Sequence, residues 1–167
     1  MPSLTFNNFP IQQVPSTKFL GLEIDSNLNW KNHIAKVENK IASVIGVLRK
    51  IRYKLSNEAA LTIYDSLIMP HILYCNIVWA SNYKSSLHKL YNLQKRALCI
   101  CLYFKKGQKT VSACPFAISN RLNVYQINMY CAGVFMYSYQ NCVLPKAFEN
   151  FFPNIVKNYV YNTRNKN

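Results

Sequence analysis

The chain has 167 residues, of which half are hydrophobic and 14% are aromatic, so it can bury a sizeable core and is not intrinsically disordered. Lys and Arg outnumber Asp and Glu by 20 to 6, for a formal net charge of +14. Residues 66–167 carry twelve Lys and Arg against one acid, Glu149. This excess favours a polyanionic partner, most simply a nucleic acid, although a compositional bias of the genome would also explain it.

The six cysteines contain no CxxC pair, and no zinc-ligand spacing links them to the three histidines. We interpret them as reduced, mostly buried thiols rather than as a disulfide framework or a metal site. The most apolar stretch, residues 67–80, is too short to span a membrane. The first ten residues lack the features of a targeting peptide. We therefore expect no membrane partner and an intracellular location.

In chain order, residues 1–25 are β-rich. Thr17–Ile24 is the strongest strand candidate, with Gly21 as a bulge or a close backbone approach, and its apolar face is expected to be uncovered. A turn follows at residues 25–27. The pattern then becomes helical, and Asn27 or Asn29 is the expected cap. Apolar residues spaced alternately three and four apart form the seam, which fits a bundle helix better than a coiled coil: Ile34, Val37, Ile41, Val44, Leu48, Ile51 and Leu55.

Four further helical segments are predicted. A helix capped by Ser56 should stop or kink at Pro70, with residues 71–80 as a buried continuation. Ser85 or Ser86 caps the next helix, which reaches Cys101, and residues 105–118 form a loop. Ser119 caps a helix to about Gln140, and a short helix covers Pro145–Phe152. The predicted fold is mainly α: a short N-terminal β-hairpin or small antiparallel sheet, followed by a bundle of four to five helices.

Several segments, in order, resemble the reverse transcriptases of non-LTR retrotransposons, the jockey-like and LINE-like elements. The resemblance begins at Phe19-Leu20-Gly21 and covers nearly the whole chain. It rests on these further residues: Asn29-Trp30-Lys31 with His33-Ile34; Leu61, Tyr64, Ser66-Leu67-Ile68, Pro70, Tyr74 and Trp79; Gln94-Lys95-Arg96-Ala97; Gly133, Phe135-Met136-Tyr137, Leu144-Pro145 and Tyr161-Asn162-Thr163-Arg164.

The resemblance implies four regions. Residues 1–28 would be the β-hairpin at the end of the palm, in which the backbone of Phe19, Leu20 and Gly21 serves as the primer grip. Residues 29–104 would be a helical, thumb-like bundle that holds an RNA or DNA template-primer duplex. Residues 105–157 would be a C-terminal helical region, and residues 158–167 a basic, frayed tail. A nuclear or cytosolic location follows from this analogy alone.

The resemblance also implies what this chain lacks. Reverse transcriptases of the family hold two divalent metal ions on an aspartate pair and a further palm aspartate. This chain has six acids and no adjacent pair. We therefore expect Mg²⁺ only in a palm and fingers region of the same polyprotein outside this chain, no cofactor here, and no polymerase activity of the isolated chain. For Glu23 and Asp25 we favour lysine pairing and turn formation over a metal site.

Two groups of cations are candidate nucleic-acid contacts. Cations also suit the C-terminal end of a helix or a solvated face, so both alternatives stay open. Tyr91, Tyr103 and Phe104 lie among the second group and could stack on bases, but their spacing favours core packing. His33 is expected to cap a helix or to be solvated. The first group is Arg49, Lys50, Arg52 and Lys54, and the second is Lys95, Arg96, Lys105, Lys106 and Lys109.

The leading hypothesis is a reverse-transcriptase fragment that positions template-primer nucleic acid without catalytic carboxylates. One alternative is a helical module exapted to bind nucleic acid. The other is a purely structural or protein-interaction bundle whose charge reflects composition. The oligomeric state stays open.

Overall fold

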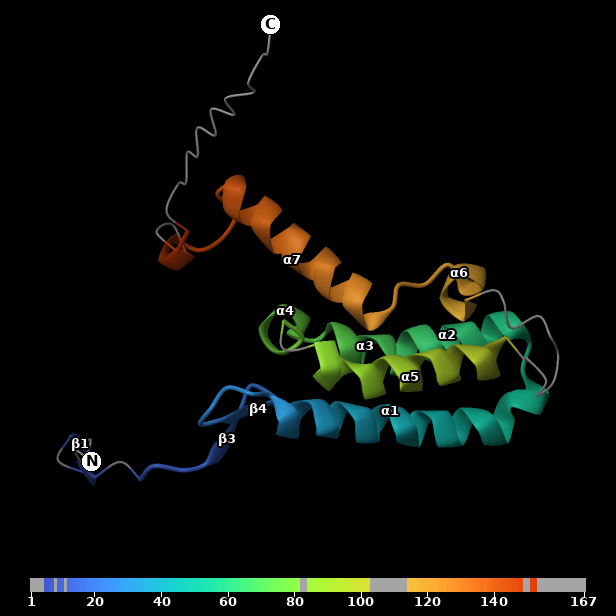
Figure 1. The fold of residues 1–167 in the computed structure, drawn as a ribbon, viewed down its shortest axis with the longest axis horizontal. Coiled ribbons are helices and arrows are strands. Elements are labelled where there is room, and N and C mark those ends of the chain that lie inside the picture. The colour runs from blue at the N-terminus through green and yellow to red at the C-terminus, as the bar shows by residue number, and fades with distance from the viewer. Residues whose placement is uncertain are drawn as a thin grey trace, which may run out of the picture. The chain divides into compact units, whose positions relative to one another are not determined.

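The computed structural model describes residues 5–7, 9–10, 12–81, 84–102, 114–148 and 151–152, and every structural statement below concerns these residues. The chain divides into two compact units, Met1–Cys131 and Ala132–Asn167, which are described separately. The predicted fold class is confirmed: short antiparallel hairpins precede a set of helices (Figure 1).

Two hairpins precede the first helix. Strands β1 (Thr5–Phe6) and β2 (Phe9–Pro10) pair antiparallel, as do β3 (Ser16–Phe19) and β4 (Leu22–Asp25). The prediction of one strand over Thr17–Ile24 is wrong, because the chain reverses at Leu20 and Gly21. Both residues have positive φ, 45° and 84°, as a two-residue hairpin turn of the I′ type requires.

The hairpin is covered on one side only. Leu22 is buried and Ile24 is half-buried against the helical core, whereas Phe19 and Leu20 are 60% and 72% exposed. The expectation of an uncovered apolar face therefore holds for the turn and fails for β4. Leu20 and Gly21 form the turn between the two strands, so the alternation of inward and outward side chains in β3 does not continue in register into β4.

Helix α1 (Lys31–Ile51) starts directly after the hairpin, and Asp25 organises that start. The Asp25 carboxylate accepts hydrogen bonds from the backbone N–H groups of Asn27 (3.1 Å), Asn29 (3.0 Å) and Trp30 (2.9 Å). Trp30, not an asparagine, occupies the N-cap position, in the left-handed region and without a side-chain cap bond. The predicted turn at residues 25–27 is thus correct. Asn29 lies one residue before the N-cap, but its side-chain oxygen accepts from the Lys31 N–H, the first of the helix, at 3.0 Å. Of the two predicted caps, Asn29 therefore contributes to the helix start.

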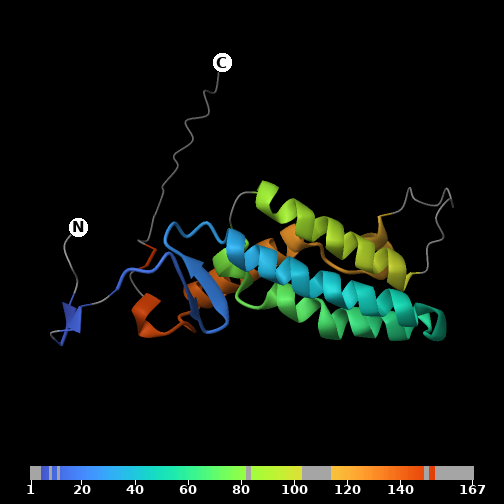
Figure 2. The same ribbon diagram turned by 90° about the horizontal axis from the view of Figure 1, so that it is seen from below.

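Three long helices form the core of the first unit. After the 3₁₀ helix η1 (Arg52–Lys54), helix α2 (Asn57–Leu67) begins at the predicted cap, where the Ser56 hydroxyl accepts from the Ala59 N–H. Helices α3 (Met69–Leu73) and α4 (Asn76–Trp79) follow, separated at Cys75, which has positive φ. Helix α5 (Lys84–Cys101) then returns beside α1 (Figure 1, Figure 2).

Buried residues from all these helices form one continuous core. The predicted seam of α1 supplies four of its fully or nearly buried members, and Trp79 and Tyr64 are the largest side chains within it. The expected helix start at Ser85 or Ser86 is late, since both lie in the first turn of α5. The core residues with the lowest exposure are Ile41, Leu48, Ala60, Tyr64, Ile68, Ile72, Trp79, Leu90, Ala97, Leu98, Cys101 and Val124.

The segment after α5 differs from the prediction. Residues 115–118, expected in a loop, belong to helix α6 (Pro115–Ser119), so Ser119 ends a helix and does not begin one. Helix α7 (Val124–Gln140) starts later and ends where predicted. The Asn123 side chain accepts from the N–H groups of Tyr125 and Gln126, and the Gln126 side chain accepts from the Asn123 N–H. This reciprocal capping, rather than a serine hydroxyl, sets the start of α7.

The second unit contains the end of α7 and the 3₁₀ helix η3 (Lys146–Phe148), a shorter element than the predicted helix over Pro145–Phe152. Aromatic rings hold it together through edge contacts. Phe135 meets Phe148 with ring centroids 5.8 Å apart, and Tyr139 meets Phe152 at 5.0 Å. The Tyr139 hydroxyl also donates to the Phe152 carbonyl at 2.8 Å.

All six cysteines are free thiols, as predicted, but only Cys101 is buried. Burial raises the pKa of the Cys101 thiol to about 11. His33 is neither a cap nor solvated: it is 5% exposed, its ring lies 5.5 Å from that of Trp79, and its Nδ1 accepts from the Glu23 N–H. In the described residues, no helix is long and apolar enough to cross a bilayer.

Candidate nucleic-acid interface

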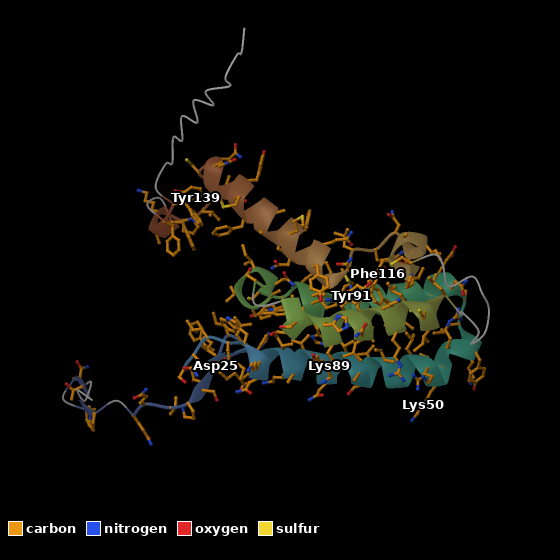
Figure 3. The ribbon with its side chains drawn as sticks, in the orientation of Figure 1. Asp25, Lys50, Lys89, Tyr91, Phe116 and Tyr139 are labelled. Atoms are coloured by element: carbon orange, nitrogen blue, oxygen red, sulfur yellow. The ribbon has the colours of Figure 1, made fainter. Side chains whose placement is uncertain are left out.

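The first predicted group of cations lies at the C-terminal end of α1. Arg49, Lys50 and Lys54 are exposed, and Figure 3 shows Lys50 projecting from the end of α1 away from the other helices. The like-charge neighbours in this group cost an isolated helix about 0.2–0.5 kcal/mol per pair. The negative end of the α1 dipole offsets part of that cost.

Arg52 is placed differently from its neighbours. It is 7% exposed, and its guanidinium donates to the carbonyls of Ile100 (2.8 Å) and Cys101 (2.9 Å) at the end of α5. It also bonds the Leu55 carbonyl and the Asn57 side chain. The guanidinium thus satisfies carbonyls that a helix end leaves without partners. Because these bonds occupy it inside the protein, Arg52 does not contribute to a phosphate-binding surface.

The exposed aromatic ring of Tyr53 lies within this first group. Tyr53 is 73% exposed, and the Lys54 Nζ lies 5.6 Å from the centroid of its ring. We call Arg49, Lys50, Tyr53 and Lys54 the α1-end cluster.

In the second group, the motif Gln94-Lys95-Arg96-Ala97 alternates between the inside and the outside of the bundle. Gln94 and Ala97 are fully buried, whereas Lys95 and Arg96 are exposed. Lys105, Lys106 and Lys109 lie outside the described residues, as do Tyr103 and Phe104. Tyr91 packs against Phe116, with ring centroids 5.4 Å apart (Figure 3), which agrees with the preference for core packing.

Gln94 connects three parts of the first unit. Its Nε2 donates to the Tyr64 hydroxyl of α2 at 2.8 Å and to the Leu122 carbonyl at 3.0 Å. Its Oε1 accepts from the Val124 N–H, the first residue of α7, at 2.9 Å. The side chain that precedes the two exposed cations therefore fixes α5 to α2 and to the start of α7.

A salt bridge defines a second basic surface between α1 and α5. Lys89, whose side chain is 73% exposed, pairs with the nearly buried Glu38 carboxylate at 2.7 Å (Figure 3). On α5, Arg96 lies two turns beyond Lys89. On α1, Arg49 lies three turns beyond Glu38. Each arginine is therefore on the same face of its helix as the salt-bridge residue. Helices α1 and α5 run in the same direction, because Arg52, which follows α1 directly, donates hydrogen bonds to carbonyls at the C-terminal end of α5. We call Arg49, Lys89 and Arg96 the α1–α5 face.

Of the proposed primer-grip residues, Phe19 ends β3, and Leu20 and Gly21 form the β3–β4 turn, which contacts Tyr74 at the end of α3. The Tyr74 hydroxyl, at the end of α3, donates to the Leu20 carbonyl. A methyl group added at Gly21 would lie 3.6 Å from the nearest atom of the Tyr74 ring, and the positive φ of Gly21 disfavours other residues there. The Leu20 carbonyl is therefore occupied by Tyr74. The side chains of Phe19 and Leu20 are exposed and do not belong to the core.

The carboxylates near the hairpin have the uses that the sequence favoured. Glu23 forms a salt bridge with Lys36 at 2.7 Å, and the hydrogen bond and charge of Lys36 lower the pKa of its carboxyl. Backbone N–H groups, that of Asn29 foremost, lower the pKa of Asp25. No group of three or more His, Cys, Asp or Glu side chains gathers anywhere in the described part of the chain. Glu23 and Asp25, occupied in this way, do not fit a two-metal site.

Sequence reasoning missed three residues of this region: Tyr53, Lys89 and the connecting role of Gln94. For Tyr53 a signal existed, since it is an aromatic residue between the cations of the first group. For Lys89 the signal was weaker, because its partner Glu38 is 51 positions away and falls on the seam side of α1. Nothing in the local sequence shows that Gln94 would be buried.

Comparison with known proteins relates this chain to proteins of retrotransposable elements. A 115 kDa protein of the type-1 retrotransposable element R1DM of Drosophila melanogaster is 26% identical over 116 residues, which cover 66% of this chain. The RNA-directed DNA polymerase from mobile element jockey of the same organism is 27% identical over 100 residues, or 58% of this chain. The match spans 11% of the length of each relative. No family model and no solved structure matches.

Proposed function

We propose that this chain is part of an RNA-directed DNA polymerase of a non-LTR retrotransposon and positions the template-primer duplex. In this proposal, residues 1–28 are the primer-grip hairpin and residues 29–104 the thumb-like bundle. Residues 105–157 and 158–167 are the C-terminal helical region and the basic tail. The catalytic carboxylates and their Mg²⁺ belong to a palm and fingers region elsewhere in a longer protein.

Two kinds of observation support the proposal. The relatives come from retrotransposable elements, and one of them carries the polymerase activity in its name. The observation that carries it for this chain is the arrangement of the cations. Two buried polar side chains, Arg52 and Gln94, hold the backbone at the two places where exposed cations cluster. Because the protein backbone at these places is already ordered, contact with a regular phosphate backbone costs little further conformational entropy.

The decisive experiment measures binding of the purified chain to an RNA–DNA template-primer duplex at several salt concentrations. Three to six phosphate contacts predict a slope of log K against log salt of about −3 to −5 on duplex DNA, with a comparable trend for the hybrid. The test variant combines Arg49→Gln with Arg96→Gln, which should lower the slope by about 2. Lys89 is left in place because it pairs with the nearly buried Glu38 carboxylate. An absent or salt-independent affinity would favour the structural or protein-interaction alternative.

A second assay separates a polymerase part from an independent enzyme. The purified chain, supplied with primer, template, Mg²⁺ and deoxynucleotides, should not extend the primer. Extension by the chain alone would overturn the assignment of catalysis to another region. Equal affinity for unrelated RNA and DNA, with no preference for a primer-template junction, would favour the exapted nucleic-acid-binding module.

A further inference from the structure

Tyr53 is the feature of the described surface that the proposed duplex contacts leave unexplained. Its side chain is 73% exposed, next to the buried Arg52 and at the point where α1 gives way to η1. Cations at this place suit the negative end of the helix dipole. That argument accounts for Lys50 and Lys54, but it gives no reason for an aromatic ring in solvent among them.

The backbone that carries Tyr53 is held on both sides. Arg52 fixes η1 to the end of α5 through the Ile100 and Cys101 carbonyls, and the Leu55 N–H donates to the Arg52 carbonyl at 3.2 Å. The ring therefore projects from a fixed base. A preorganised aromatic surface loses little conformational entropy when a flat ligand stacks on it.

The charges around the ring are those that a nucleic-acid strand would meet. Arg49 and Lys50 precede Tyr53 by four and three residues, so helical geometry places them on its side of α1. Lys54 already lies 5.6 Å from the ring centroid. The nearest acid along the chain is Glu58, which is exposed in the first turn of α2. The local balance is three cations to that one acid.

We propose that the α1-end cluster binds single-stranded nucleic acid, with Tyr53 stacked on an unpaired base. Arg49, Lys50 and Lys54 contact the phosphates that flank that base. Sequence-tolerant stacking on an aromatic ring, combined with cations along the backbone, is the usual chemistry of single-strand recognition. The proposal rests on the proposed function for its nucleic-acid partner and adds an unpaired segment next to the duplex as the ligand of this site.

The test uses fluorescence anisotropy with a labelled oligo-dT and a labelled oligo-U as probes, and a blunt duplex as the comparison. Tyr53→Ala and Tyr53→Leu should weaken single-strand binding by about 5- to 150-fold and leave the salt slope unchanged. Tyr53→Phe, which keeps the ring, should bind within about twofold of the parent. The double variant Lys50→Gln, Lys54→Gln should lower the single-strand slope by about 1.4.

Tyr137 provides a matched control. It is 67% exposed on α7, a helix without any Lys or Arg, so Tyr137→Ala should leave single-strand binding unchanged. An unchanged melting temperature shows that a variant is folded. If Tyr53→Ala melts at a lower temperature than the parent, Tyr53→Leu, which keeps a large apolar side chain, provides the test in its place. If Tyr53→Ala and Tyr53→Leu bind single strands like the parent while the duplex slope persists, this inference fails and the proposed function stands. If the parent binds the duplex but neither single-stranded probe at low salt, this inference alone fails; if it binds none of the three, both fail.

Discussion

The buried amide of Gln94 allows the sharpest quantitative test of this structure. Replacing it by leucine keeps a similar volume but removes two donors and one acceptor. The Tyr64 hydroxyl and the Val124 N–H belong to fully buried residues and would lose their partner, whereas Leu122 is 44% exposed and its carbonyl can reach water. Two buried groups without partners cost about 1–3 kcal/mol each, so Gln94→Leu should lower the free energy of unfolding by about 2–6 kcal/mol.

The assay is urea unfolding followed by tryptophan fluorescence, to which the fully buried Trp79 and the partly buried Trp30 contribute, and by far-UV circular dichroism. With an m-value of about 2 kcal/mol/M, a loss of about 3 kcal/mol lowers the midpoint by about 1.5 M. The matched control is Asn92→Leu, an exposed position on the same helix, which should change stability by no more than about 0.5 kcal/mol. Equal effects of the two substitutions would refute the connecting role of Gln94.

A second variant adds a pH dependence. Gln94→Glu keeps the acceptor for Val124 but places a carboxyl in a fully buried site, where burial raises its folded-state pKa above the unfolded value of about 4.3. The folded state then holds the proton more tightly than the unfolded state. The variant should therefore approach the parent at about pH 4 and lose stability as pH rises through the raised pKa. A constant difference from the parent between about pH 4 and pH 8 would contradict this account.

Three further outcomes are expected. Burial lowers the pKa of His33, so the unfolded state takes up its proton first, and stability should fall as pH drops below about 6.5; His33→Gln should flatten that part of the profile in urea titrations. Arg52→Met should lower the free energy of unfolding by about 3 kcal/mol or more, whereas Lys54→Met should change it by no more than about 0.5 kcal/mol, both by urea denaturation. Asp25→Ala should lower the Tm by roughly 2–8 °C in calorimetry, and the parent should lose this contribution as pH falls through the lowered pKa of Asp25.

The sequence predicted the helices of the first unit because their signals are local. The apolar spacing of α1 and the Ser56 cap of α2 each lie within a few residues of the element they define. The start of α7 was missed although its signal is also local, since Asn123 and Gln126 have the spacing of reciprocal capping. A serine before an apolar run, such as Ser119, is a common cap, but here its hydroxyl bonds carbonyls of α6.

The candidate interface was less predictable because burial depends on distant partners. Arg49 and Arg52 are indistinguishable in the sequence, three residues apart in one helical pattern. Arg52 is buried because carbonyls 48 and 49 positions away accept its hydrogen bonds. His33 is a similar case, since Trp79 covers its ring. Glu23 and Asp25, by contrast, find their partners within thirteen residues, and their predicted uses are confirmed.

At both groups of candidate contacts, a buried polar residue lies next to exposed cations. This arrangement links the stability of the bundle to the proposed binding. At the end of α1, Arg52 lies inside and its neighbours outside. In α5, Gln94 lies inside while Lys95 and Arg96 lie outside. A substitution at Arg52 or Gln94 should therefore weaken nucleic-acid binding only to the extent that it unfolds the chain. Adding a stabilising osmolyte should restore binding to those variants. The same treatment should not restore it to Lys95→Gln or Arg96→Gln, which stay folded and lose a contact.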